Sequence, residues 1–204
     1  DQLKEMIEKV KEAAAKVPDD DTKIEISDKV NILGYQISTI LGGSRVIGSV
    51  EPEINSKSVE KWGLVYAIDN IDCVDTKVTE GDMYVGSNSE YVATMESTPL
   101  GTSTGVSGVS KMATCFTTTT LFSAGNAKEF SAKYKVRAYA LLSDGTYVYS
   151  KVGNYSVYGI SNYLYQSQQM RTKSAHDYLY NNILKVVSPY YEEIKFNWDN
   201  SLAK

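Results

Sequence analysis

The sequence predicts a mainly β fold built from antiparallel sheets. Between about residues 23 and 157, short apolar stretches rich in Val, Ile, Tyr and Thr are separated by Gly, Ser, Asn and Asp, a pattern typical of strands and turns. No helical spacing interrupts those stretches, so the strands are expected to stack as an immunoglobulin-like or fibronectin-III-like β-sandwich. Helical spacing occurs before and after them, which divides the chain into residues 1–22, 23–157 and 158–204.

Residues 1–17 are predicted to form an amphipathic helix. Apolar residues recur at intervals of three and four, and Lys and Glu fill the opposite face. Pro18 and the acidic run 19–21 end this helix. We interpret the acidic run as a solvated linker. A calcium site is the weaker alternative, because the ligand spacing of an EF-hand loop is missing.

Strands are predicted near residues 23–27, 29–40, 44–51, 59–68, 90–97, 111–122, 133–142 and 146–157. The clearest pairing joins residues 134–142 to 146–150 through Asp144 and Gly145, because glycine supplies the positive φ that a tight hairpin needs. Within the first arm, Val136 and Ala138 belong to a face predicted to lie in the core. The other face carries Arg137 and Tyr139 and is predicted to be half solvated.

Helical spacing returns after Ser156. A short helix is predicted around residues 160–164, and a second from about 172 to 187, with Thr172, Lys173 or Ser174 as its cap and Pro189 after its end. The tail from 190 to 204 is aromatic and is predicted to be a last strand or an extension. We expect residues 158–204 to pack on the sandwich.

The composition excludes several function classes. The 204 residues are 42% hydrophobic and 23% charged with a net charge of −4, so the chain is neither disordered nor equipped to neutralise nucleic-acid phosphates. No stretch approaches 18 uninterrupted apolar residues, so no membrane insertion is expected. The chain begins without a charged and apolar leader, and it is interpreted as an excised piece of a larger protein.

The residues that usually carry catalysis are sparse. The single histidine, His176, is predicted to be structural or superficial, and no cluster has the spacing of metal ligands. Cys73 and Cys115 could pair in an oxidising compartment or remain buried thiols. Residues 99–110 form a glycine-rich loop without the Lys-Ser/Thr ending of a phosphate loop. The carboxylate pairs lie in polar turns, so no enzyme, cofactor or metal is predicted.

Tyrosine is the more informative residue type, with 16 Tyr against 4 Phe and 2 Trp. A phenol ring offers an apolar face to sugar C–H groups and a hydroxyl for hydrogen bonds. Trp62 alternates with apolar residues and is predicted to lie in the core, and many of the tyrosines could equally pack across strands. The candidate ligand-binding residues are Tyr147, Tyr149, Tyr155, Tyr158 and Trp198.

The chain resembles modules of large extracellular proteins from gut Firmicutes such as clostridia and ruminococci. The resemblance is carried by four parts of the chain, which are residues 34–46, 62–67, 134–150 and 158–184. Such modules occur beside dockerins, cell-wall anchors, carbohydrate-binding modules and glycoside hydrolases, including systems that adhere to starch. The resemblance implies secretion or display at the cell surface. It provides no ligand residue.

The expected function is therefore binding rather than catalysis. We expect a secreted, non-catalytic and monomeric module that binds a polysaccharide, with starch or another α-glucan as the candidate, through an aromatic platform. The alternative is an immunoglobulin-like spacer or protein-adhesion module without a sugar site, with cell-surface or cellulosome-like modules as its partners. Exposed coplanar aromatic rings beside Asn, Gln or Asp would favour the first, and tyrosines packed inward would favour the second.

Overall fold

A computed structural model of the chain describes residues 24–71, 74–102, 112–122 and 125–188. The predicted N-terminal helix and acidic linker, the aromatic tail, Cys73 and most of the predicted loop over residues 99–110 lie outside them.

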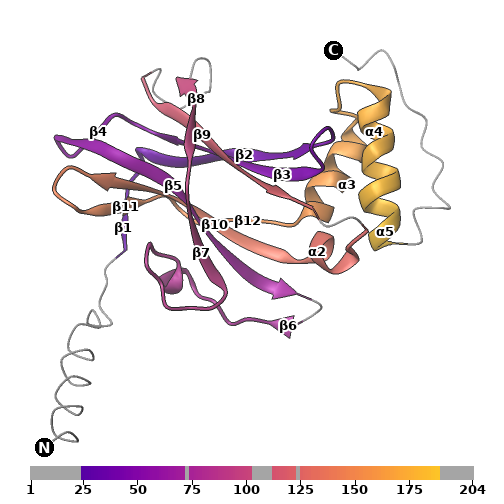
Figure 1. The fold of residues 1–204 in the computed structure, drawn as a ribbon, viewed down its shortest axis with the longest axis horizontal. Coiled ribbons are helices and arrows are strands. Elements are labelled where there is room, and N and C mark those ends of the chain that lie inside the picture. Colours follow the sequence, from indigo (N-terminus) through magenta and orange to yellow (C-terminus); the bar gives the residue numbers. More distant parts are fainter. Residues whose placement is uncertain (1–23, 72–73, 103–111, 123–124, 189–204) are drawn as a thin grey trace, which may run out of the picture.

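The chain is mainly β, as predicted, and its strands form two sheets (Figure 1). The strands are β1 (Glu25–Ile26), β2 (Val30–Ser38), β3 (Gly43–Val50), β4 (Glu53–Ile54), β5 (Lys57–Ile71), β6 (Val74–Asp75), β7 (Val92–Glu96), β8 (Thr98–Thr102), β9 (Thr114–Leu121), β10 (Lys133–Leu142), β11 (Tyr147–Tyr149) and β12 (Gly153–Tyr155). The larger sheet has the order β1-β11-β10-β5-β4, with β12 also paired to β10, and β6 and β7 also paired to β5. The smaller sheet has the order β2-β3-β9-β8.

The larger sheet is mixed, which differs from the wholly antiparallel sandwich that the sequence predicts. Strand β1 runs parallel to β11, with Glu25 beside Val148 and Ile26 beside Tyr149. The other pairings among the described strands are antiparallel. After β1 the chain crosses to β2 in the other sheet, so β1 pairs with a strand distant in sequence. Residue types in such a short strand do not specify the direction of its partner.

The turns explain where the strands reverse. Gly145 has a φ of +85°, and the Leu142 N–H donates to the Thr146 carbonyl at 2.9 Å, so the predicted β10–β11 hairpin is confirmed. Strands β4 and β5 are joined by Asn55 and Ser56, which both have positive φ (52° and 60°). Positive φ at both central residues is the requirement of a type I′ turn in a two-residue hairpin. The Asn-Ser pair is an unusual sequence for it, which is why the sequence does not predict β4.

A bulge divides the strand predicted over residues 146–157. Tyr139 pairs with Tyr149 and Val136 pairs with Gly153, so one extra residue lies on the second strand. Ser150 fills the irregularity. Its N–H donates to the Ala138 carbonyl at 2.9 Å, and its hydroxyl accepts from the Ala138 N–H at 2.9 Å. A side-chain oxygen thereby replaces a backbone acceptor in the ladder.

Two apolar layers cover the two faces of β10. Val136 and Ala138 belong to the central core, which also contains Leu64 and Phe116 and has Trp62 packed against it, as predicted. Tyr139 belongs to a second cluster on the outer side of the larger sheet. The prediction of a half-solvated outer face is therefore wrong. Each large buried side chain contributes about 1.5–3 kcal/mol relative to its exposed state.

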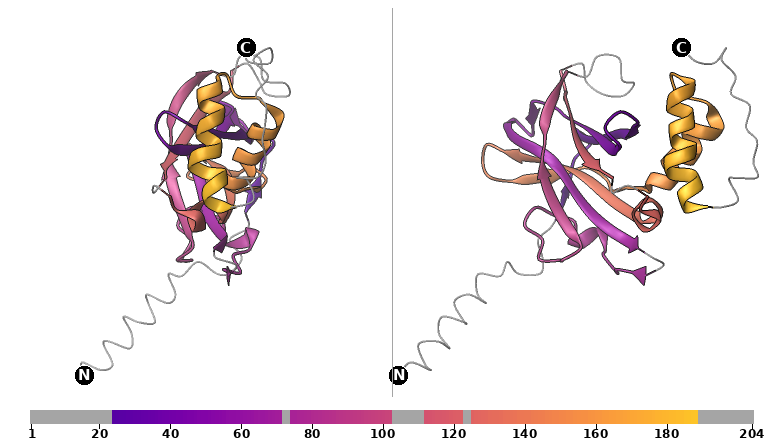
Figure 2. Two further views of the ribbon diagram at one scale, coloured as in Figure 1. Left: turned by 90° about the vertical axis from the view of Figure 1, so that its right-hand side faces the viewer. Right: turned by 45° about the vertical axis from the view of Figure 1, so that its right-hand side comes forward.

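The helices are gathered at one end of the sheets, beyond β2 and β3 (Figures 1 and 2). They are α2 (Ala127–Ser131), α3 (Val157–Ser167), α4 (Lys173–Leu179), the π-helical turn η2 (Tyr180–Leu184) and α5 (Lys185–Val187). The 3-10 helix η1 (Glu80–Asp82) lies apart from them. The helix predicted from about residue 172 to 187 is confirmed, and the Thr172 hydroxyl caps it by accepting from the Ala175 N–H at 3.2 Å.

The helices form their own core with the far end of the smaller sheet. Leu179, Ile183 and Leu184 are fully buried there, together with Phe130 of α2 and Ile37 of β2. Helix α2 is not predicted by the sequence, because five residues are too few for an apolar period to be recognised. The Asn126 side chain caps α2 by accepting from the Glu129 N–H at 3.1 Å.

Candidate functional site: an aromatic groove along the free edge of β2

Of the two rings in the predicted platform, Tyr149 is covered by another part of the chain and Tyr147 is half-buried. The two rings stack with centroids 6.4 Å apart, but Tyr149 is only 4% exposed. The segment between β6 and β7 packs over it, and the Val85 N–H donates to the Tyr149 hydroxyl at 3.1 Å. Tyr149 therefore offers no open ring face, and its predicted place in a binding platform is corrected to a place in the outer cluster.

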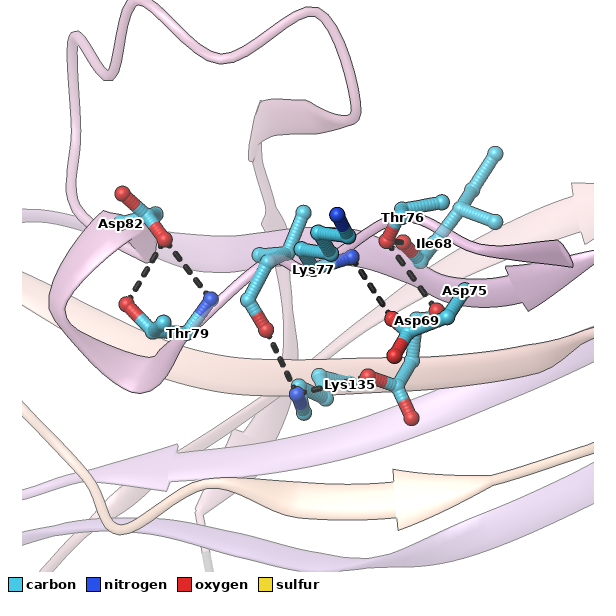
Figure 3. Close-up of polar contacts among 9 residues, drawn as sticks. Ile68, Asp69, Asp75, Thr76, Lys77, Thr79, Asp82 and Lys135 are labelled. Carbon is cyan, nitrogen blue, oxygen red and sulfur yellow. Dashed lines mark hydrogen bonds and ion pairs between the residues drawn. The ribbon is translucent and has the colours of Figure 1, made fainter.

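Polar contacts hold that covering segment on the sheet (Figure 3). Lys135 on β10 forms an ion pair with Asp69 at 2.7 Å and donates to the Val78 carbonyl at 2.7 Å. Asp82 accepts from both the N–H and the hydroxyl of Thr79 at 2.7 Å. These bonds lower the pKa of Asp82. Lys135 therefore joins the segment to the sheet, and Asp82 stabilises the turn within the segment.

Arg137 is the second anchor beneath the segment. Its side chain is almost fully buried, and Nη1 donates to the carbonyls of Glu80 and Met83 at 3.2 and 3.3 Å. Its guanidinium also lies 5.8 Å from the centroid of the Tyr149 ring. A buried cation with these partners fixes the covering segment and the aromatic ring together. The part of the outer face beneath this segment is therefore closed to a ligand.

The other predicted residues are distributed differently. Tyr155 is half-buried between two more tyrosines, with ring centroids 4.9 Å from Tyr35 and 5.3 Å from Tyr134. Burial raises its pKa. Tyr158 is also half-buried but packs against the helical core, so it does not join Tyr155. Trp198 lies outside the described residues.

An open groove follows the free edge of β2. Among the described strands, β2 pairs with β3 alone and is an edge strand of the smaller sheet. Beside it lie three depressions with cavity volumes of about 950, 460 and 690 Å³, and Tyr35 lines all three. The opposite wall is formed by the bulge after β11, by β12 with the start of α3, and by the loop between α3 and α4. We call this the β2 groove.

The middle of the β2 groove combines aromatic rings with amides. Tyr163 on α3 is 62% exposed and lines the groove with Tyr35 and Tyr155. Asn154 and Gln169 line the same section. The Gln169 amide donates to the Tyr163 hydroxyl at 3.2 Å. This arrangement places flat apolar surface beside both hydrogen-bond donors and acceptors.

The local sequence explains the position of these rings. The Ser156 hydroxyl caps α3 by accepting from the Gly159 N–H at 3.0 Å, so Gly159 and Tyr163 follow at a spacing of four on one helix face. Across the groove, Gly153 lacks a side chain where a Cβ would lie 2.1 Å from the Tyr35 hydroxyl. The glycine allows Tyr35 to cross over the bulged strand and stack on Tyr155.

Sequence reasoning missed Tyr35 and Tyr163 as site residues. Tyr35 lies in a predicted strand, and its orientation toward α3 depends on the tertiary arrangement. For Tyr163, its position on the helix could have indicated a surface role. It is exposed on a helix whose other side, at Val157, Ser161 and Tyr165, is buried, and a large aromatic ring on the polar side of an amphipathic helix indicates a surface role.

The described residues hold no group of three or more His, Cys, Asp or Glu side chains that could bind a metal ion. His176 is only 2% exposed and stacks on Tyr165 with centroids 4.1 Å apart, so of its two predicted positions the structural one is confirmed. Cys115, on β9, is a half-buried free thiol.

Within the described ranges, none of the helices has the length and apolar character needed to cross a membrane. No protein-family model matches the chain, and none of the curated proteins compared with it matches its sequence.

Proposed function

We propose that this chain is a non-catalytic module that binds a polysaccharide in the β2 groove. The observation that carries the proposal is the exposed ring of Tyr163 beside Tyr35 and Tyr155, with the amides of Asn154 and Gln169 in the same section. Sugar rings present C–H faces that pack on aromatic rings, and their hydroxyls exchange hydrogen bonds with amides. The proposed binding site is therefore the β2 groove and not the predicted platform at the buried Tyr149.

The shape of the groove favours a chain-like ligand. Its three sections adjoin one another along β2 through the shared Tyr35, so a polymer could contact more than one of them. Charged side chains of both signs line the ends of the groove, including Asp28 at one end and Arg171 at the other. A neutral polymer of hydroxyl groups suits such a lining better than a polyanion does.

The resemblance to modules of gut Firmicutes gives this proposal its biological setting. It supports an extracellular module beside carbohydrate-active domains, and starch or another α-glucan as the first ligand to test. Secretion or display at the cell surface remains part of the proposal. The net charge of −4 is compatible with a neutral glycan.

Affinity electrophoresis tests the proposal. The unmodified protein is run through native gels that contain starch, xylan, mixed-linkage β-glucan or galactomannan, and retardation by at least one of them is expected. Tyr163→Ala should weaken retention about 5- to 30-fold, since loss of one stacking ring costs about 1–2 kcal/mol. Tyr163→Phe is the matched control, because it keeps the ring and removes only the hydroxyl.

The alternative function is a spacer or protein-adhesion module without a sugar site. Two observations favour it. The tyrosines of the outer face are packed inward, and the free edge of β2 could accept an added strand from a partner protein. An absence of retardation on every polysaccharide would support this alternative and overturn the glycan proposal.

A further inference from the structure

A second cavity lies on the other side of the tyrosine stack. Its volume is about 230 Å³, smaller than the roughly 300–1,000 Å³ of pockets for drug-sized ligands. It lies between the sheets, with residues of β5, β7 and β10 on one side and of β3 and β9 on the other, and Tyr155 forms part of its wall. We call it the inter-sheet pocket.

The lining of the inter-sheet pocket is mainly aromatic and apolar. Besides Tyr155 it includes Tyr66, Tyr91, Tyr134 and Phe122, which come from four different parts of the fold. Two of the hydroxyls already make hydrogen bonds within the protein. Tyr66 donates to the Thr118 hydroxyl at 3.0 Å, and Tyr134 donates to the Glu129 carbonyl at 3.4 Å. The pocket therefore offers aromatic carbon more than free hydroxyl groups.

The charge of the pocket has one sign. The only charged side chains among the lining residues are Glu90, in the turn before β7, and Glu129 of α2. Both act on the rings beside them. A hydrogen bond to Glu90 raises the pKa of Tyr91, and burial together with the charge of Glu129 raises the pKa of Tyr134. An anion would be repelled here, whereas a cation would be attracted by both carboxylates.

We propose that the inter-sheet pocket binds the ammonium head of a small organic cation. Tyrosine rings attract a cation through their quadrupoles, and nearby carboxylates add a longer-range attraction. Alkylated ammonium groups are favoured over metal ions, because their apolar surface matches the aromatic lining. The volume suits a head of the size of tetramethylammonium or a primary alkylammonium. Tyr155 lines both sites, but cation binding in this pocket does not require a ligand in the β2 groove and goes beyond glycan binding.

The test titrates the whole chain by two-dimensional NMR with choline, butylammonium and 3,3-dimethylbutanol, the uncharged carbon analogue of choline. We expect at least one of the two cations to shift amide signals of residues 90–95, and the uncharged analogue to bind at least about tenfold more weakly. A preference for choline would indicate a quaternary ligand, and a preference for butylammonium a lysine-like one. Equal binding of the uncharged analogue, or no binding of either cation, would overturn the proposal.

Two variants separate this pocket from the β2 groove. Glu90→Gln, an exposed substitution that thermal melting can verify as folded, should weaken cation binding about threefold or more and leave polysaccharide retention unchanged. Tyr163→Ala should do the reverse. Unchanged cation affinity in both Glu90→Gln and Glu129→Gln would contradict the role of the carboxylates. If no polysaccharide binds, the cation titration still tests this proposal, because it uses other ligands and other variants.

Discussion

Tyr149 provides the sharpest distinction between a ring that binds a ligand and a ring that supports the fold. Its hydroxyl accepts from the Val85 N–H at 3.1 Å, and the guanidinium of Arg137 lies 5.8 Å from its ring centroid. Tyr149→Phe removes the hydrogen bond and leaves the ring, so it should lower the free energy of unfolding by about 1–3 kcal/mol. Tyr149→Ala also removes the ring and should cost about 3–5 kcal/mol.

The assays are urea denaturation and thermal melting of both variants, alongside affinity electrophoresis of the folded Tyr149→Phe protein. A loss of 1 kcal/mol should lower the melting temperature by about 2–4 °C in a domain of this size. Retention on polysaccharide should be unchanged, because the ring lies under the segment between β6 and β7. Reduced retention without a loss of stability in Tyr149→Phe would refute the structural role assigned to this residue.

Two further predictions concern packing and pH. Gly63→Ala should lower the free energy of unfolding by at least about 1–3 kcal/mol, because a Cβ at that position would lie 2.2 Å from the Met95 carbonyl oxygen and 2.7 Å from the Tyr139 ring. Gly34→Ala is the control, since a Cβ there would have no atom within 4 Å. It should change the free energy of unfolding in urea by less than about 0.5 kcal/mol. Burial lowers the pKa of His176 in the folded chain, so its contribution to stability is complete above about pH 6.5, the value of an unfolded histidine. That contribution should be lost as the pH falls through the folded pKa, by at most about 1.4 kcal/mol per pH unit. Urea titrations between pH 5 and 8 should show a shallower dependence in His176→Phe, and an identical dependence would contradict the assignment.

The strands were predictable because their signals are local. The alternation in residues 133–142 and the Asp144-Gly145 turn specify β10 and its hairpin without reference to any other part of the chain. The caps of α3 and α4 at Ser156 and Thr172 are likewise properties of short segments. What the sequence could not specify was which strands meet across long distances, as the parallel pairing of β1 with β11 shows.

The candidate site was less predictable for the same reason. Alternation correctly places Tyr147 and Tyr149 on one face, but it cannot reveal that a segment about 60 residues earlier covers that face. The same segment buries Arg137, although an arginine in a strand is ordinarily expected to be solvated. Tyr155 was predicted as a site residue, whereas its partner Tyr35 comes from the other sheet.

The most direct test of polysaccharide binding in the β2 groove is an NMR titration of the isotope-labelled chain with a linear malto-oligosaccharide. If the ligand lies in the groove, the largest amide shifts should fall on residues 153–169 and on β2 around Tyr35, and Tyr163→Ala should reduce them. Shifts confined to the segment between β6 and β7, or no shifts with this or any other soluble glycan, would contradict binding in the β2 groove.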